Sequence, residues 1–185
     1  MDVQNKASHN KEVRVIEYLK SRGDMNVLLQ LLEACKLDTI FDVSESNITL
    51  IAPTDEAFVR LFDDMEITKE EFMSNRELVD LLIKYHIIKK RLTLEEIANS
   101  TELISINDYE IKVDVMRDEQ NGRMVVILQE FSEITELITC QDGVVCTVLE
   151  VMIPKLDIAD TDIQPDTDEL ASDTSLKYSD DEDDN

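Results

Sequence analysis

The sequence predicts an α+β fold, with helices in the first half of the chain and antiparallel strands in the second. Apolar residues recur at helical spacing from Val13 to Tyr85. From Tyr109 onward, apolar and polar residues alternate with the period of two that is typical of half-buried strands. Helices that precede the strands, rather than alternating with them, indicate segregated layers. The chain has 185 residues and is 43% hydrophobic, enough for one domain with a sizeable core.

The first predicted elements are two amphipathic helices, a buried strand and a third helix. The strand is the apolar run at residues 48–51, which Pro53 ends, and Thr54 is placed to cap the third helix. Apolar residues at helical spacing mark the three helices: Val13, Ile16 and Leu19; then Leu28, Leu29, Leu31, Leu32 and Cys35; then Ala57, Phe58, Leu61 and Phe62.

Capping boxes predict three further helix starts. In such a box, a Ser or Thr hydroxyl accepts a hydrogen bond from the third helical N–H, while a glutamate reaches back to the cap. The helix predicted to begin after Ser74 carries Leu78, Leu81, Leu82 and Tyr85 on one side. The three predicted boxes are Thr68 with Glu71, Ser74 with Glu77, and Thr93 with Glu96.

Two tight turns organise the predicted strands. Asn121-Gly122 joins residues 109–115 to residues 124–128, and Asp142-Gly143 joins residues 136–140 to residues 144–152. A two-residue loop at Asp142-Gly143 would place Cys140 opposite Val145 and Thr139 opposite Cys146. The two thiols would then point to opposite faces of the hairpin, so we expect no disulfide between them.

The charge of the chain is concentrated at its C-terminal end. Lys and Arg number 18 and Asp and Glu number 42, which gives a formal net charge of -24. Residues 157–185 hold twelve acids, one base and few bulky apolar residues, so burial cannot offset the entropy of ordering them. We expect a flexible N-terminal arm at residues 1–10, a folded domain at residues 11–156 and a disordered acidic tail at residues 157–185.

This composition excludes several classes of function. The charge disfavours contact with nucleic-acid phosphates or anionic membranes, and no apolar run is long enough for membrane insertion. The chain has only three glycines, and they do not form the motif of a phosphate loop, a dinucleotide-binding fingerprint or a nucleophile elbow. Three cysteines and two histidines form no paired zinc spacing, so we expect no metal and no cofactor.

Three segments resemble signatures of the fasciclin domain family. Their spacing and order agree with the family, and the resemblance covers roughly residues 11–156. A Pro-Gly that usually follows the Tyr-His segment in the family is Lys89-Lys90 here. The segments are Thr49-Leu50-Ile51-Ala52-Pro53-Thr54-Asp55-Glu56-Ala57-Phe58; Tyr85-His86-Ile87-Ile88 with Arg91-Leu92-Thr93; and Asp142-Gly143-Val144-Val145 with residues 148–154.

The resemblance implies a wedge of antiparallel strand layers with helices along one edge. It also implies adhesion or protein binding, usually outside the cell, and no catalysis. Some members bind integrins through the Tyr-His segment, which would place receptor contacts at Tyr85, His86, Ile87 and Ile88. The alternative interpretation of these residues is a helix end followed by a buried strand.

Arg22-Gly23-Asp24 is a second candidate receptor contact, because many integrins bind this tripeptide. Its carboxylate could complete a partner's metal coordination while its guanidinium reaches an acidic pocket. The alternative is structural: Gly23 would end the first helix, and Asp24 would cap the second.

Thr54, Asp55 and His86 are the candidate framework residues. Asp55 would either stabilise the N-terminus of its helix or pair with His86. We expect His86 to be a core histidine held by a hydrogen bond. An acid–base pair of Asp55 and His86 is the remaining route to an enzyme, and no nucleophile lies near either residue in the sequence.

Modification sites depend on where the protein resides. Asn47-Ile48-Thr49 and Asn99-Ser100-Thr101 would carry glycans only in a secreted chain, whereas Ser179 precedes acids that suit an acid-directed kinase. The N-terminus lacks the pattern of a signal peptide, which favours the cytoplasm, with secretion as the alternative.

The sequence therefore predicts a non-catalytic interaction or adhesion module that binds an integrin-type receptor. The alternative is an intracellular adaptor, whose domain face and acidic tail bind a basic protein partner. No feature of the sequence predicts an oligomeric state.

Overall fold

A computed structural model describes residues 7–9 (backbone only), 13–41, 47–117 and 122–155 of the chain. The chain divides into two units, Met1–Pro154 and Lys155–Asn185. The predicted acidic tail at residues 157–185, with Ser179, lies outside the described residues, as does most of the predicted arm at residues 1–10.

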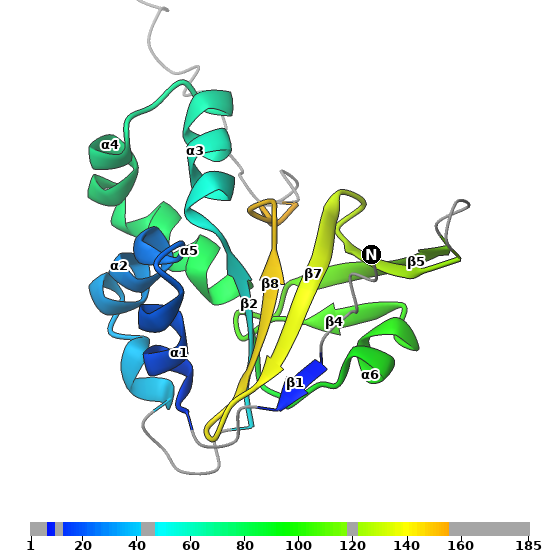
Figure 1. Cartoon of the computed structure of the whole chain (residues 1–185). Coiled ribbons are helices and arrows are strands. Elements are labelled where there is room, and N and C mark those ends of the chain that lie inside the picture. The colour runs from blue at the N-terminus through cyan, green and yellow to red at the C-terminus, as the bar shows by residue number, and fades with distance from the viewer. Residues whose placement is uncertain (1–6, 10–12, 42–46, 118–121, 156–185) are drawn as a thin grey trace, which may run out of the picture. The chain divides into compact units, whose positions relative to one another are not determined.

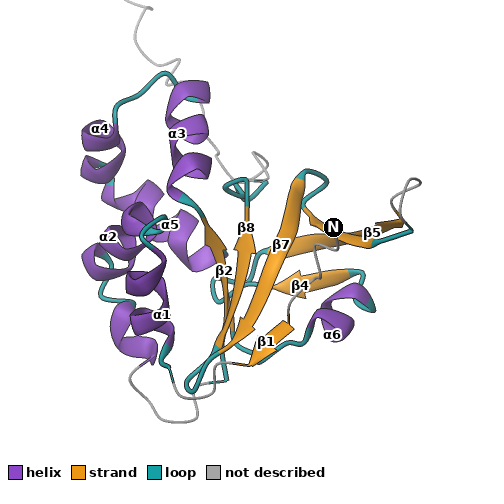
Figure 2. Ribbon diagram, viewed as in Figure 1, coloured by secondary structure: helices purple, strands orange, loops and turns teal. Residues whose placement is uncertain are grey.

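Helices dominate the first half of the unit Met1–Pro154 and strands the second, as the sequence predicted (Figures 1 and 2). The helices are α1 (Val15–Arg22), α2 (Asn26–Ala34), the 3-10 helix η1 (Asp38–Phe41), α3 (Asp55–Asp64), α4 (Lys69–Ser74), α5 (Arg76–Tyr85) and α6 (Leu94–Ala98). The strands are β1 (Ala7–His9), β2 (Thr49–Pro53), β3 (Ile87–Ile88), β4 (Glu102–Ile104), β5 (Glu110–Arg117), β6 (Met124–Leu128), β7 (Ser132–Thr139) and β8 (Val144–Val148). Among the described residues, no helix is long and apolar enough to cross a membrane.

The strands form a mixed sheet rather than purely antiparallel layers. Their order is β3-β2-β8-β7-β6-β5-β4, and β1 pairs with β7. β2 runs parallel to β8, which differs from the antiparallel layers expected, and β1, a strand within the predicted flexible arm, runs parallel to β7. A parallel pair requires a long crossover, and the described residues between β2 and β8 form four helices and five strands. Hairpin signals in the sequence therefore carried no information about this pairing.

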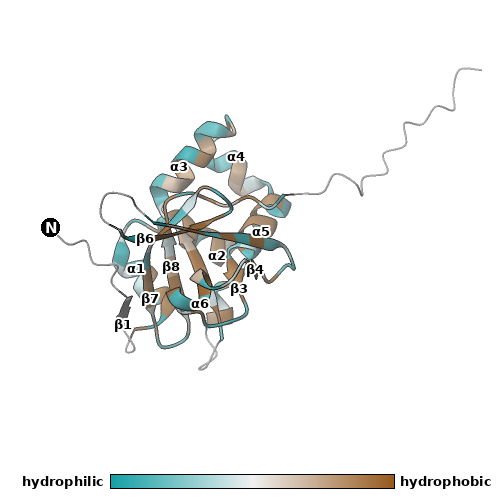
Figure 3. Ribbon diagram, turned by 90° about the vertical axis from the view of Figure 1, so that its right-hand side faces the viewer, coloured by the Kyte–Doolittle hydropathy of each residue, from teal (hydrophilic) through white to brown (hydrophobic). Residues whose placement is uncertain are grey.

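The sheet has a hydrophobic core on each face. Alternation along β2 sends Leu50 and Ala52 to the core beneath the helices and Ile51 to the opposite core. The first core packs α1, α2, α3 and α5 against β2 and β8, and the second lies beneath β5 and β6. Figure 3 shows apolar stretches on the central strands and on α5.

The turn between β7 and β8 differs from the prediction by one residue. Thr139 lies opposite Val144, and the Cys140 N–H donates to the Gly143 carbonyl at 2.9 Å, so Gln141 and Asp142 form the turn. Gly143 lies just after the turn in a closely packed position, where a Cβ would lie 3.0 Å from the Val15 side chain and 3.1 Å from the Ile48 carbonyl. Cys140 and Cys146 still lie in opposite cores, and both are free thiols.

Local capping signals identified most helix starts. Thr54 accepts a hydrogen bond from Ala57 N–H at 3.3 Å, and the boxes at Thr68 and Thr93 are both present. The box predicted at Ser74 is wrong, because α4 continues through Ser74 and Asn75 caps α5 instead. The Asn75 side chain accepts from Leu78 N–H at 3.1 Å.

Candidate functional site

The Arg22-Gly23-Asp24 tripeptide lies on the turn between α1 and α2. Gly23 ends α1 in the left-handed conformation, with φ at 73°, as the structural alternative predicted. Asp24 does not cap α2, because Met25 occupies the cap position and the Asp24 carboxylate pairs with Arg22. The prediction of an Asp24 cap is therefore wrong.

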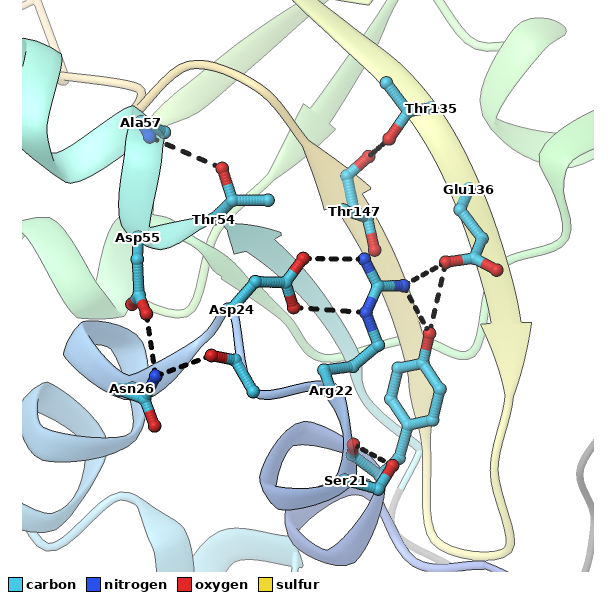
Figure 4. A network of polar contacts seen from close by, with 12 residues as sticks. Ser21, Arg22, Asp24, Asn26, Thr54, Asp55, Ala57, Thr135, Glu136 and Thr147 are labelled. Atoms are coloured by element: carbon cyan, nitrogen blue, oxygen red, sulfur yellow. Dashed lines mark hydrogen bonds and ion pairs between the residues drawn. The ribbon is translucent and has the colours of Figure 1, made fainter.

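Arg22 is held by three groups of its own domain (Figure 4). Its Nε and Nη2 donate to the two Asp24 carboxylate oxygens at 3.2 and 3.0 Å. Its Nη1 donates to Tyr18 Oη at 3.0 Å and also pairs with the Glu136 carboxylate on β7. The hydrogen bonds to Asp24 and then to Tyr18 raise the pKa of Arg22 further above its already high usual value, against the effect of burial. The two charged ends of the tripeptide thus face each other instead of extending into solvent.

This pairing opposes the receptor contact expected of the tripeptide. A receptor that binds both ends must first separate Arg22 from Asp24. The Asp24 side chain is 47% exposed, and an exposed ion pair contributes only about 0–1 kcal/mol, so Asp24 can be released at low cost. Arg22 is 27% exposed and would stay bound to Glu136 and Tyr18 after that release.

Asp55 supplies the cap that α2 lacks. From the first turn of α3, its carboxylate accepts from Val27 N–H at 2.8 Å and from the Asn26 side chain at 2.8 Å. Its own N–H donates to the Asp24 carbonyl at 2.7 Å. Asp55 therefore joins the N-terminus of α3 to that of α2, and it does not pair with His86.

Asp55→Ala is expected to lower the free energy of unfolding by about 1–2 kcal/mol, the usual cost of losing a helix cap. Urea unfolding measures this change. The matched control is Glu56→Ala in the same turn of α3, where the side chain is 79% exposed and pairs with Arg60. Equal losses from the two substitutions would show that the carboxylate of Asp55 contributes only its charge near a helix end.

The Tyr-His segment is buried. α5 ends at Tyr85, and β3 begins at Ile87, as the structural alternative predicted. Tyr85, His86 and Ile87 are fully buried, and Ile88 is 5% exposed. These four side chains fill the cores of the domain, so they present almost no surface to a receptor in this structure.

His86 uses both ring nitrogens inside the core. Its Nδ1 lies 2.8 Å from the Leu82 carbonyl, and its Nε2 accepts from Met152 N–H at 3.1 Å. Nε2 is therefore unprotonated, and Nδ1 carries the proton and donates to Leu82. Burial lowers the pKa of His86 to about 4, partly offset by the hydrogen bond to Leu82. His86 is a neutral residue that joins α5 to the segment after β8.

The residues considered for acid–base chemistry do not lie together. Asp55 and His86 bind different partners, so the acid–base pair considered from the sequence does not form. Burial raises the pKa of Cys140 and Cys146 to about 12, so both thiols stay protonated at neutral pH. Within the described residues, no three His, Cys, Asp or Glu side chains are grouped to hold a metal ion.

Sequence reasoning missed two partners of the tripeptide. Tyr18 lies four residues before Arg22 on α1, a helical spacing that could have identified it. Glu136 lies 114 residues away on β7, and no local pattern indicates it. Of the candidate modification sites, Asn47 and Asn99 are exposed.

The profile of the fasciclin domain matches residues 23–154. The chain belongs to the fasciclin domain family. Fasciclin domains are generally non-catalytic modules for adhesion and protein interaction. The fold is similar to that of a solved FAS1 domain pair from the insect cell adhesion molecule fasciclin I, with 18% identity and a TM-score of 0.50. The alignment covers 68% of this chain and 45% of that one, so this fasciclin domain spans less than half of the pair. No curated protein sequence matches the chain.

Proposed function

We propose that this fasciclin domain is a non-catalytic interaction module that binds a basic protein partner through an acidic face, with the acidic tail adding charge. The observation that carries this proposal is the pairing of its cations. Several of the described cations pair with acids of the same domain, and acids outnumber bases in the chain by 42 to 18, so a surplus of acids remains to face solvent. The ion pairs are Arg14–Asp142, Arg22–Asp24, Arg22–Glu136, Arg60–Glu56, Arg60–Glu150, Lys84–Asp80, Lys90–Glu96, Lys112–Glu130 and Arg123–Glu133.

The corner between α3 and α4 illustrates that surplus. Asp63, Asp64, Glu66 and Glu70 are exposed there, and none of their carboxylates has an ion-pair partner among the described residues. Acidic side chains that lie close together make the surface potential more negative, and such a surface attracts a basic partner and repels an acidic one.

The receptor route through Arg22-Gly23-Asp24 has less support. Its arginine and aspartate are paired with each other, and the other candidate, at Tyr85–Ile88, is buried. Binding of an integrin-type receptor is therefore the competing hypothesis, and the experiment below tests both.

The experiment compares proteins cross-linked to the full-length chain and to two variants. One variant is Asp24→Glu, which keeps the charge but lengthens the carboxylate of the tripeptide. The other combines Asp63→Asn, Asp64→Asn, Glu66→Gln and Glu70→Gln. We expect a basic partner that added salt releases, that Asp24→Glu retains and that the combined variant binds at least about tenfold more weakly.

The reverse pattern, loss with Asp24→Glu and retention with the combined variant, would contradict the proposal and support the receptor route. A partner that is unaffected by both variants would contradict both routes. Intact mass gives an independent readout. Phosphate on Ser179 with unmodified Asn47 and Asn99 agrees with the adaptor role, whereas a glycan at either asparagine would indicate passage through the secretory route.

A further inference from the structure

The two ends of the sheet lie side by side around a cavity. β3 and β4 are the terminal strands of the sheet order. One hydrogen bond joins β3 to the segment that follows β4, from Ile106 N–H to the Ile87 carbonyl at 2.8 Å. Beyond this bond the chain segments separate around a cavity of about 410 Å³, lined by Ile88, Lys89, Lys90, Leu92, Ser100, Glu102, Leu103, Ile104, Ser105 and Asp108.

Backbone groups without partners point to this cavity from β4. Ser105 N–H donates to Tyr109 O, and Thr101 O accepts from Val113 N–H, so these residues direct their backbone toward β5. Because successive residues of a strand face opposite edges, Glu102 and Ile104 direct their N–H and C=O groups away from β5. Among the described residues, β5 is the only strand that pairs with β4.

The wall on the β3 side begins where this short strand ends. Ile87 directs its carbonyl to Ile106, and Lys89 lies in the bend that follows β3. Within the described part of the chain, the Lys89 backbone has no hydrogen-bond partner. Both walls therefore present unpaired backbone donors and acceptors, which is the property of an open sheet edge.

The floor and rim of the cavity differ in chemistry. Ile88, Leu92 and Leu103 are at most 6% exposed and form an apolar floor. Lys89 and Lys90 are exposed on the β3 side, which is unusual in a chain of net charge -24. Lys90 lies 3.5 Å from Glu96, and Lys89 has no ion-pair partner among the described residues. Glu102 and Asp108 border the opposite wall, so positive charge is confined to the β3 side.

We propose that this cavity binds an extended segment of a partner protein, which adds a strand between β3 and β4. Its backbone pairs with Ile104 and Glu102, an apolar side chain rests on the floor, and an acidic side chain reaches Lys89 and Lys90. Unpaired backbone groups on both walls favour a polypeptide over a lipid or a small acid, and a cavity of this size suits one or two side chains. The site goes beyond the proposed function, because it takes an acidic segment whereas the acidic face takes a basic one.

The test uses the full-length chain and a fluorescent peptide that alternates valine and glutamate. A matched peptide replaces glutamate with lysine, and a second one carries N-methyl groups on alternate amides, which removes the backbone donors along one edge of the extended peptide. We expect the glutamate peptide to bind, the lysine peptide to bind about tenfold more weakly at this site, and the N-methylated peptide not to bind. Hydrogen exchange at the Ile104 and Glu102 amides should slow about tenfold or more when the glutamate peptide is bound.

Two variants locate the contact. Lys89→Glu should weaken binding of the glutamate peptide about tenfold, because attraction becomes repulsion. Lys20→Glu on α1 makes the same change of charge at an exposed residue and should leave binding unchanged. Ile104→Pro removes an N–H that makes no bond within the sheet, so it should abolish binding while the thermal midpoint is retained.

Each of four results would overturn the proposal: no binding of the glutamate peptide, binding without protection of the Ile104 and Glu102 amides, equal effects of Lys89→Glu and Lys20→Glu, or an Ile104→Pro variant that is folded and still binds. Protection of the same amides in concentrated protein without peptide would assign the cavity to a second copy of this chain instead. None of these outcomes changes the expectations for the α3–α4 corner, so the two proposals fail separately.

Discussion

Acidification from about pH 7 to about pH 5 is expected to lower the free energy of unfolding by about 2 kcal/mol through His86 alone. The ring is fully buried, and both of its nitrogens are committed to backbone groups. A proton added to Nε2 would face the Met152 N–H, which is itself a donor. Protonation therefore breaks that hydrogen bond and places a charge in an apolar core.

The direction of this effect follows from the two pKa values. The pKa of His86 is about 4 in the folded state and 6.5 in the reference state that represents the unfolded chain. Between these values the unfolded state binds more protons than the folded state, so acid favours unfolding. The stability is fully present above the unfolded pKa and is lost as the pH falls towards the folded pKa. Tyr85 is the ionisable residue whose ring packs against His86, at 6.2 Å between centroids, and it stays neutral throughout this range.

Urea unfolding of the wild type and of His86→Gln at both pH values measures the effect. The variant should be less stable at pH 7, and its loss on acidification should be smaller than that of the wild type by about 2 kcal/mol. Titration of the wild-type imidazole by NMR is independent of whether the variant folds. A His86 ring that titrates near its ordinary pKa would contradict the prediction.

The fold could be predicted wherever a local pattern specifies structure. Thr54, Thr68 and Thr93 cap helices that begin at the next residue, and their hydroxyls act within three residues. The alternation along residues 109–115 identified β5 for a similar reason, since burial on one face imposes a period of two. One error arose where a distant segment decides the outcome, because β2 pairs with β8 across most of the domain. The other is local, because Asn75 rather than the preceding Ser74 caps α5.

The candidate site shows the same limit. Arg22-Gly23-Asp24 is a short motif whose receptor role needs two free charged ends, yet Glu136 and Tyr18 help to hold the arginine. The Tyr-His segment resembled a receptor contact, whereas its branched apolar residues are also ordinary core material, and the burial of all four residues supports the second interpretation. A motif specifies residue types, but their exposure depends on the segments that pack on them. The cavity between β3 and β4 had no sequence signal, because it depends on how the two ends of the sheet approach.

Asp142→Ala is expected to cause the largest loss of stability among single polar substitutions considered for this domain, about 2–4 kcal/mol. Asp142 is 2% exposed in the β7–β8 turn, 127 residues from the α1 N–H that it caps. One carboxylate oxygen accepts from Val15 N–H at 2.7 Å, and the other accepts from Arg14 Nε at 3.1 Å. The cap position of α1 is Arg14, whose side chain makes no capping hydrogen bond, so the distant aspartate takes over that role.

Alanine at position 142 leaves the buried Val15 N–H without its acceptor and removes the carboxylate beside Arg14. A buried polar group that has lost its partner lowers stability by more than the net contribution of the original hydrogen bond. Asp142→Asn should cost about half as much, because its amide oxygen can still accept from Val15 while its NH₂ group faces the arginine. The control is Gln141→Ala, the exposed neighbour in the same turn, which should change stability by less than about 0.5 kcal/mol. If Asp142→Ala were as stable as Gln141→Ala, the first helix would not depend on the closing hairpin. A loss of stability that is smallest for Gln141→Ala, intermediate for Asp142→Asn and largest for Asp142→Ala would instead show that α1 and the β7–β8 turn unfold as one unit through this carboxylate.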